Sequence, residues 1–103
     1  MSAARIRARG KAGFGVEDVL DFTTVARLAA QGERMFARGG RVEIDLQGVR
    51  SANSAGIALL LEWLDLARRR GVSLRYRNIP ESLASLAGLA NLSGLIPVVR
   101  DGA

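Results

Sequence analysis

Residues 42–63 read Val-Glu-Ile-Asp-Leu-Gln-Gly-Val-Arg-Ser-Ala-Asn-Ser-Ala-Gly-Ile-Ala-Leu-Leu-Leu-Glu-Trp. Polar and apolar residues alternate from Arg41 to Leu46, and this period of two predicts a half-buried β-strand. The polar residues 47–53 predict a loop. A helix is predicted over 54–70, because apolar residues then recur at helical spacing and Gly71 can end a helix in the left-handed conformation. The stretch therefore predicts a strand, a loop and a helix in succession.

The flanking residues extend this alternation of strands and helices. Upstream, residues 13–22 predict two short strand segments with a turn near Asp18, and residues 25–36 predict a helix capped by Thr23 or Thr24. Downstream, we expect a strand at 72–76, a helix at 80–90 and a last short strand at 96–99 that Pro97 interrupts. Strands joined by helices form parallel crossovers. We therefore expect a single α/β domain, with a mixed β-sheet of four to five strands and helices packed against it.

Composition limits the chemistry that is open to the chain. Its 103 residues suffice for one domain, and 49% of them are hydrophobic, so a core can form without disulfides. Cysteine and histidine are both absent from the sequence, which excludes thiolate and imidazole metal ligands and any catalytic triad built on histidine. A binding or regulatory module is therefore favoured over an enzyme, and no cofactor or metal is expected.

The positive charge is concentrated at the N-terminus. The formal net charge is +5, and four of the positive charges belong to Arg5, Arg7, Arg9 and Lys11. We expect residues 1–12 to be a basic, disordered leader, with a weak phosphate or lipid contact as the alternative, and residues 13–100 to form the domain. No apolar run approaches the length of a membrane span. We therefore expect a cytoplasmic protein. No nucleic-acid partner is expected, because residues 75–77 offer a single aromatic side chain for stacking.

The start of the central helix is the strongest candidate for function. Ser54 places a hydroxyl where backbone N–H groups are unpaired and the helix dipole is positive. One hypothesis is that Asn53 or Ser54 is only the N-cap, which contributes about 1 kcal/mol. The other is that Ser54 accepts a phosphoryl group, whose charge the helix end would tolerate but an apolar partner surface would not, because the charge would lose its water there. The residues alone do not decide between the two.

The central helix is also more apolar than one buried face requires. Its inward stripe consists of Ile57, Leu60, Leu61, Leu64 and Ala67. Leu59, Trp63 and Leu66 align at the edge of this stripe or outside it. Either neighbouring helices cover them, or they form an exposed ridge that docks a partner, since exposed tryptophan and leucine mark association surfaces.

The central stretch and its flanks resemble the STAS domain family, which includes the bacterial anti-sigma factor antagonists. In that family a strand ending in Asp-Leu is followed by a short loop, Asp-Ser or Asp-Thr, a small residue, Gly and a leucine-rich helix. Here the pattern reads Asp45-Leu46 and then Asn53-Ser54-Ala55-Gly56. Residues 20–25 and Asn78-Ile79-Pro80 also fit, so the resemblance covers residues 14–97.

Within the family, residues 55–61 and 86–92 look most similar to the MlaB-like members, which are small cytoplasmic subunits of phospholipid-transporting ABC complexes in the Gram-negative inner membrane. The resemblance implies a non-catalytic subunit that binds the transporter's ATPase, is peripheral to the membrane through that partner, and helps to maintain outer-membrane lipid asymmetry. The alternative is an anti-sigma factor antagonist that its kinase switches by phosphorylating Ser54. Asn53 stands where the family usually has aspartate, which favours constitutive docking. The expected contact residues are Asn53, Ser54, Ala55, Gly56, Leu59, Trp63 and Leu66.

Overall fold

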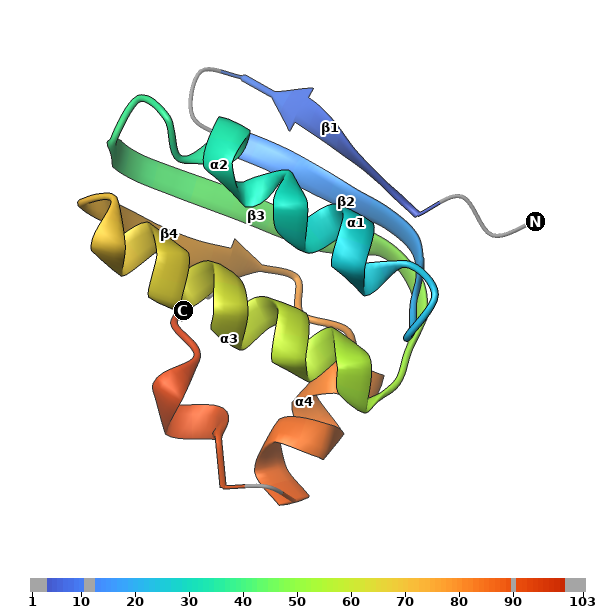
Figure 1. The fold of residues 1–103 in the computed structure, drawn as a ribbon. Helices are drawn as coiled ribbons and strands as arrows, with labels where there is room; N and C mark the ends of the chain where they lie inside the picture. Colours follow the sequence, from blue (N-terminus) through green and yellow to red (C-terminus); the bar gives the residue numbers. More distant parts are fainter. Residues whose placement is uncertain (1–3, 11–12, 90, 100–103) are drawn as a thin grey trace.

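A five-stranded sheet with helices over one of its faces forms the domain (Figure 1). The computed structural model describes residues 4–10, 13–89 and 91–99. The strands are β1 (Arg5–Arg9), β2 (Gly13–Leu20), β3 (Gly40–Ala52), β4 (Val72–Arg77) and β5 (Val98–Val99). The helices are α1 (Val25–Ala30), α2 (Gly32–Met35), α3 (Ser54–Arg69) and α4 (Glu81–Leu89), followed by the 3₁₀ helix η1 (Ser93–Leu95). The predicted single α/β domain with a mixed sheet is confirmed.

The strands follow one another across the sheet in chain order, β1-β2-β3-β4-β5. The pair β1–β2 is antiparallel, and the pairs β2–β3, β3–β4 and β4–β5 are parallel. Each parallel pair is joined by a helical crossover, as such pairs require. Because β2, β3 and β4 all run the same way, their carboxyl ends meet at one edge of the sheet. The amino end of α3 lies at this edge.

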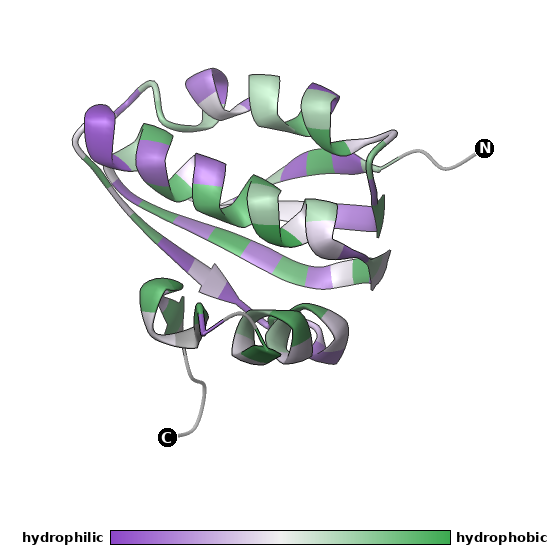
Figure 2. Cartoon of the chain, turned by 60° about the horizontal axis from the view of Figure 1, so that its bottom comes forward, coloured by the Kyte–Doolittle hydropathy of each residue, from purple (hydrophilic) through white to green (hydrophobic). Residues whose placement is uncertain are grey.

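The core lies between the sheet and the helices. Along β3, Val42, Ile44 and Leu46 are buried, whereas the alternate residues Glu43 and Asp45 lie on the face without helices and are only partly buried. Figure 2 shows the resulting alternation of apolar and hydrophilic residues along the strands. One hydrogen bond ties the two layers together: the buried hydroxyl of Tyr76 in β4 donates to the carbonyl oxygen of Leu60 in α3 over 2.7 Å.

The N-terminal segment differs from its prediction. Arg5–Arg9 is an edge strand in antiparallel register with β2, so the disordered leader expected over 1–12 is wrong for these residues. Residues 1–3 and 11–12 lie outside the described part of the chain. The arginines all point to the open face of the sheet, where Arg5 pairs with Glu17 and Arg9 with Asp45, each at 3.1 Å. β1 is a strand with one charged face, and it belongs to the domain.

Other boundaries shift as well. The strand predicted to end at Leu46 continues to Ala52, so the expected loop over 47–53 is wrong. The two segments expected over 13–22 are one strand, with register shifts between Gly15 and Glu17 and between Asp18 and Val19. Asp18 has a φ of 80° at the second shift, so the expected turn is a bulge. The helix predicted over 25–36 is divided into α1 and α2, whereas the predicted α3 and its left-handed end at Gly71 are confirmed.

Candidate functional site

Ser54 is the first residue of α3, and its side chain is exposed. The preceding Asn53 is the N-cap: its side-chain oxygen accepts a hydrogen bond from the Ala55 N–H over 2.8 Å. No hydrogen bond of the Ser54 hydroxyl is found within the described residues. The first turn of α3 carries no acidic side chain, so the positive end of the helix dipole is not compensated from within the helix. This end of α3 can therefore accept an acidic or carbonyl group from outside.

A second loop lies beside the start of α3. Leu20 and Ala52 are partners at the ends of β2 and β3, and the Asn53 N–H donates to the Leu20 carbonyl oxygen over 3.1 Å. The loop that follows Leu20 is built on Asp21, whose carboxylate accepts the Thr23 N–H at 2.8 Å and the Thr23 hydroxyl at 2.6 Å. The hydrogen bond from the Thr23 hydroxyl is the main reason that the pKa of Asp21 lies below its ordinary value. The loop is therefore held in one shape next to Ser54.

The predicted capping role of Thr23 or Thr24 takes a different form. Thr24 is at the N-cap position of α1, but its side chain makes no capping hydrogen bond to the helix. Its buried hydroxyl accepts the Asp21 N–H over 3.1 Å and donates to the Val19 carbonyl oxygen over 2.9 Å. Thr24 therefore fastens the loop to the end of β2.

Phe22 is the apolar feature of this surface that the site prediction missed. Its side chain is 75% exposed, and it lies between Asp21 and Thr23, which the hydrogen bonds above hold in place. An exposed aromatic ring on a well-ordered loop is a common anchor for a partner protein. The sequence signal was an aromatic residue inside a polar turn, Asp21-Phe22-Thr23-Thr24.

Ala55 and Gly56 are buried and serve the packing of α3. A methyl group on Gly56 would lie 3.0 Å from Leu83 Cδ2 and 3.3 Å from the β-carbon of Ala52. Such contacts are at the limit of close packing. The glycine therefore lets α3 approach both the end of β3 and α4. The prediction that these two residues contact a partner is wrong, because both are buried.

The predicted ridge on α3 is also buried. Leu59 is 1% exposed, Trp63 0% and Leu66 8%, so the expectation that they dock a partner is wrong. The short helix α2 covers Trp63 and Leu66: a methyl group on Gly32 would lie 2.8 Å from Leu66 Cδ2 and 3.0 Å from Trp63 Cδ1. The indole N–H of Trp63 has no acceptor in the described part of the structure. The alternative considered above, that neighbouring helices cover this edge, is the observed one.

Of the residues described above, four are exposed at this end of the sheet. We call the exposed residues Phe22, Thr23, Asn53 and Ser54 the Ser54 surface. Nothing in it pairs a nucleophile with a general base, and no group of acidic side chains able to hold a metal ion is found among the described residues. None of the helices in the described ranges is long and apolar enough to cross a bilayer. The arrangement offers an exposed aromatic side chain on the loop that follows Leu20, together with a free hydroxyl and an uncompensated helix end, which suits protein binding.

Comparisons with known proteins agree with this fold. A family model described as "Mlab, STAS domain" matches residues 5–98. A comparison with curated proteins finds no match. The solved structure of the anti-sigma factor antagonist SpoIIAA in its unphosphorylated form is similar, with a TM-score of 0.70 and 12% identity over 96% of this chain and 90% of that chain.

Two further solved structures share the fold. An anti-sigma factor antagonist from Mycobacterium paratuberculosis has a TM-score of 0.72 and 16% identity over 99% of this chain and 88% of that one. An anti-sigma-factor antagonist (STAS) domain protein from Planctomyces limnophilus has a TM-score of 0.70 and 16% identity over 99% and 92% of the two chains. The N-terminal limit of the family match, residue 5, coincides with the start of β1.

Proposed function

Because the chain belongs to the MlaB-type STAS domain family, we propose that it is a non-catalytic cytoplasmic subunit that binds and regulates the ATPase of an ABC phospholipid transporter. Its place in the cell would be the inner face of the inner membrane, reached through that ATPase. The lipid movement that it supports would maintain outer-membrane asymmetry. STAS domains act through protein–protein contacts, and the proposal names one such contact.

The observation that carries the proposal is the Ser54 surface. Phe22 supplies apolar area that water contacts in the free protein, and its burial by a partner would contribute favourably to binding. The amino end of α3 supplies N–H groups and a partial positive charge for an acidic or carbonyl group of the ATPase. The backbone that carries each feature is held before binding, next to Phe22 by the Asp21 turn and at the helix end by the Asn53 cap. A preformed surface loses little conformational entropy when it binds.

Asn53 supports constitutive docking over a phosphorylation switch. An aspartate would cap α3 in the same way and would also place a negative charge beside the Ser54 hydroxyl. With asparagine the cap is kept and the charge is absent, so the helix end stays positive and open to the partner. This favours a contact that does not depend on modification.

The test is binding to the cognate ATPase. The chain should copurify with the ATPase and the permease, and Ser54→Glu should weaken binding at least about tenfold by placing a charge at the contact. Ala37→Glu is the matched control, because it adds the same charge at an exposed position. Ala37 lies just before the start of β3, whereas Ser54 follows the end of that strand. Equal binding by Ser54→Glu and the unmodified chain would contradict the proposal.

The second candidate is an anti-sigma factor antagonist switched at Ser54. It is favoured by the exposed Ser54 hydroxyl, which is free of hydrogen bonds in the described residues. Incubation with a cognate kinase and ATP separates the two candidates. Stoichiometric phosphate on Ser54, absent from Ser54→Ala, would establish the switch. Phosphorylation only in Asn53→Asp, together with copurification with the ATPase, would support the constitutive role.

A further inference from the structure

One edge of the sheet is only partly paired. β4 is in register with β3 along its whole length, from Gly40 opposite Val72 to Asp45 opposite Arg77. On its other side, β5 pairs only with Tyr76 and Arg77. Within the described residues, the first four residues of β4, 72–75, therefore have no neighbouring strand on this side.

Pro97 explains where the pairing stops. The Tyr76 N–H donates to the Pro97 carbonyl oxygen over 2.9 Å. The next rung of a parallel ladder, one step towards the start of β4, would need an N–H from residue 97, and proline has none. β5 therefore does not extend along the first half of β4.

The unpaired edge presents backbone groups of known identity. Alternate residues of a strand direct their N–H and C=O groups to the same side. Since the Tyr76 N–H faces β5, those of Leu74 and Val72 face the same, open side, whereas Ser73 and Arg75 face β3. The edge therefore offers two donors and two acceptors at the spacing that an added strand requires.

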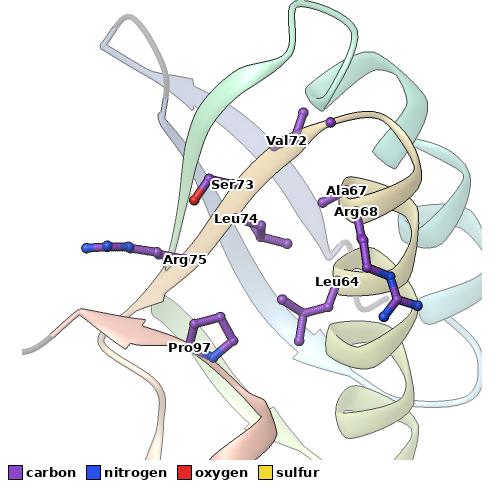
Figure 3. Close-up of a pocket in the computed structure, with 9 residues that line it drawn as sticks. Leu64, Ala67, Arg68, Val72, Ser73, Leu74, Arg75 and Pro97 are labelled. Carbon is purple, nitrogen blue, oxygen red and sulfur yellow. The ribbon is translucent and has the colours of Figure 1, made fainter.

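A groove follows this edge. The groove is shallow and open to solvent, with a volume of about 580 Å³ between the first half of β4, the second half of α3 and Pro97 (Figure 3). Its floor is apolar and consists of Leu64 and Ala67 of α3 and Leu74 of β4, and the exposed Arg68 of α3 also lines it. Figure 3 shows Arg75 directed away from α3, on the other side of the strand. A strand in the groove would therefore have one side towards the apolar floor and Arg68, and the other side towards Arg75.

The charge on that second side is positive. Arg41 of β3 and Arg75 of β4 are exposed on the open face of the sheet, and neither makes an ion pair among the described residues. The nearby Glu43 is already paired with Arg77 at 2.6 Å. A second copy of this chain would bring like charges together at such an edge, which disfavours self-pairing. A negatively charged strand would be attracted.

We propose that the open edge of β4 binds an extended acidic segment of a partner protein as an additional strand. Its backbone pairs with Val72 and Leu74, its apolar side chains contact the partly exposed Leu64, and its acidic side chains, at alternate positions, contact Arg75 and Arg41. Recognition by strand addition draws its affinity from main-chain hydrogen bonds and its specificity from such alternate side chains. The groove lies at the opposite end of α3 from Ser54, so this inference does not depend on the proposed function.

The test uses the full chain and a short synthetic peptide in which valine alternates with glutamate. Amide hydrogen exchange should slow about tenfold or more at Val72 and Leu74 when the peptide is added, and should not change at Ser73. Two control peptides should bind at least about tenfold more weakly: one with lysine in place of glutamate, and one with N-methylated backbone amides.

The variants sharpen the test. Arg75→Glu should weaken peptide binding about tenfold, whereas Arg34→Glu, the same charge change at an exposed position on α2, should leave it unchanged. The proposal is overturned if the glutamate peptide does not bind, if the lysine or N-methylated peptide binds equally well, or if protection appears at Ser54 instead. It is also overturned if Val72 and Leu74 become protected by dimerisation without peptide, because the edge would then belong to a second copy.

Discussion

The hydroxyl of Ser54 is free because its neighbour caps the helix. The side-chain oxygen of Asn53 takes the Ala55 N–H, so the hydroxyl that follows makes no hydrogen bond in the described residues and faces solvent. Asn53 therefore caps the helix, and the adjacent Ser54 is left available for a partner. The cap keeps α3 in place whatever Ser54 binds.

This division can be tested by changing the cap alone. Asn53→Ala should lower the free energy of unfolding by about 1 kcal/mol, because an N–H of the first turn loses its acceptor. Asn53→Asp should be at least as stable as the unmodified chain, since a carboxylate both accepts the hydrogen bond and interacts favourably with the helix dipole. Urea titration measures both variants. An Asn53→Ala chain of unchanged stability would show that the observed cap contributes nothing.

Trp63 acts through the core and not through an interface. Trp63→Ala should lower the free energy of unfolding by about 3–5 kcal/mol, because a fully buried ring is lost beneath α2. Trp63→Phe should lose less, since it keeps an apolar ring and removes the indole N–H that has no acceptor among the described residues. Denaturant unfolding gives both values. A stable Trp63→Ala chain with lower affinity for its partner would restore the exposed-ridge hypothesis.

Between elements, the hydrogen bond from Tyr76 to Leu60 joins β4 to α3. Burial raises the pKa of Tyr76 well above 10.0, because the charged phenolate would be desolvated. The unfolded chain therefore releases this proton first, so the stabilisation is complete below about pH 10 and is lost as the pH rises further. Tyr76 is the only tyrosine, so one group can be followed.

We accordingly expect the free energy of unfolding to fall above about pH 10 in the unmodified chain. Tyr76→Phe should be less stable by about 1 kcal/mol at neutral pH, through loss of the hydrogen bond, and should lack most of the alkaline decrease. Chemical denaturation at a series of pH values tests both. Tyrosinate absorbance that titrates with an ordinary pKa in the folded chain would contradict the buried position.

The elements that the sequence predicted well are those whose signals are local. α3 has helical periodicity, a polar cap and a glycine end, and all three are present in the structure. The sequence did not predict β1 or the second half of β3, because both are stabilised by pairing with β2. In β2, Glu17 lies opposite Arg5 of β1 on one side and opposite Gly48 of β3 on the other. Polar residues in a paired strand do not differ in composition from a loop or a tail.

The same distinction between local signals and long-range packing applies to the candidate site. The cap and the free hydroxyl at the start of α3 depend on neighbouring residues and could be predicted. The burial of Trp63 depends on how α2 packs on α3, and the exposure of Phe22 depends on tertiary packing too. Gly32, the residue that lets α2 approach Trp63, gives no sign of that contact in the sequence. Long-range packing therefore decided which apolar residues were available to a partner.

In the molecule as a whole, α3 connects two different surfaces. Its amino end lies with the carboxyl ends of β2 and β3 and forms the Ser54 surface. Its other end lies beside the groove along β4. The helix contains 16 residues and spans about 24 Å at 1.5 Å per residue, so one partner segment of a few residues cannot cover both. A partner could engage each surface separately.

The Phe22→Ser variant is the most direct test of the central claim, that the Ser54 surface binds a partner. Its side chain is mainly exposed, so the substitution should leave the unfolding free energy within about 0.5 kcal/mol. Titration calorimetry with the cognate ATPase should show affinity reduced at least about tenfold, because the apolar anchor is gone. Unchanged affinity in a correctly folded Phe22→Ser chain would contradict the account.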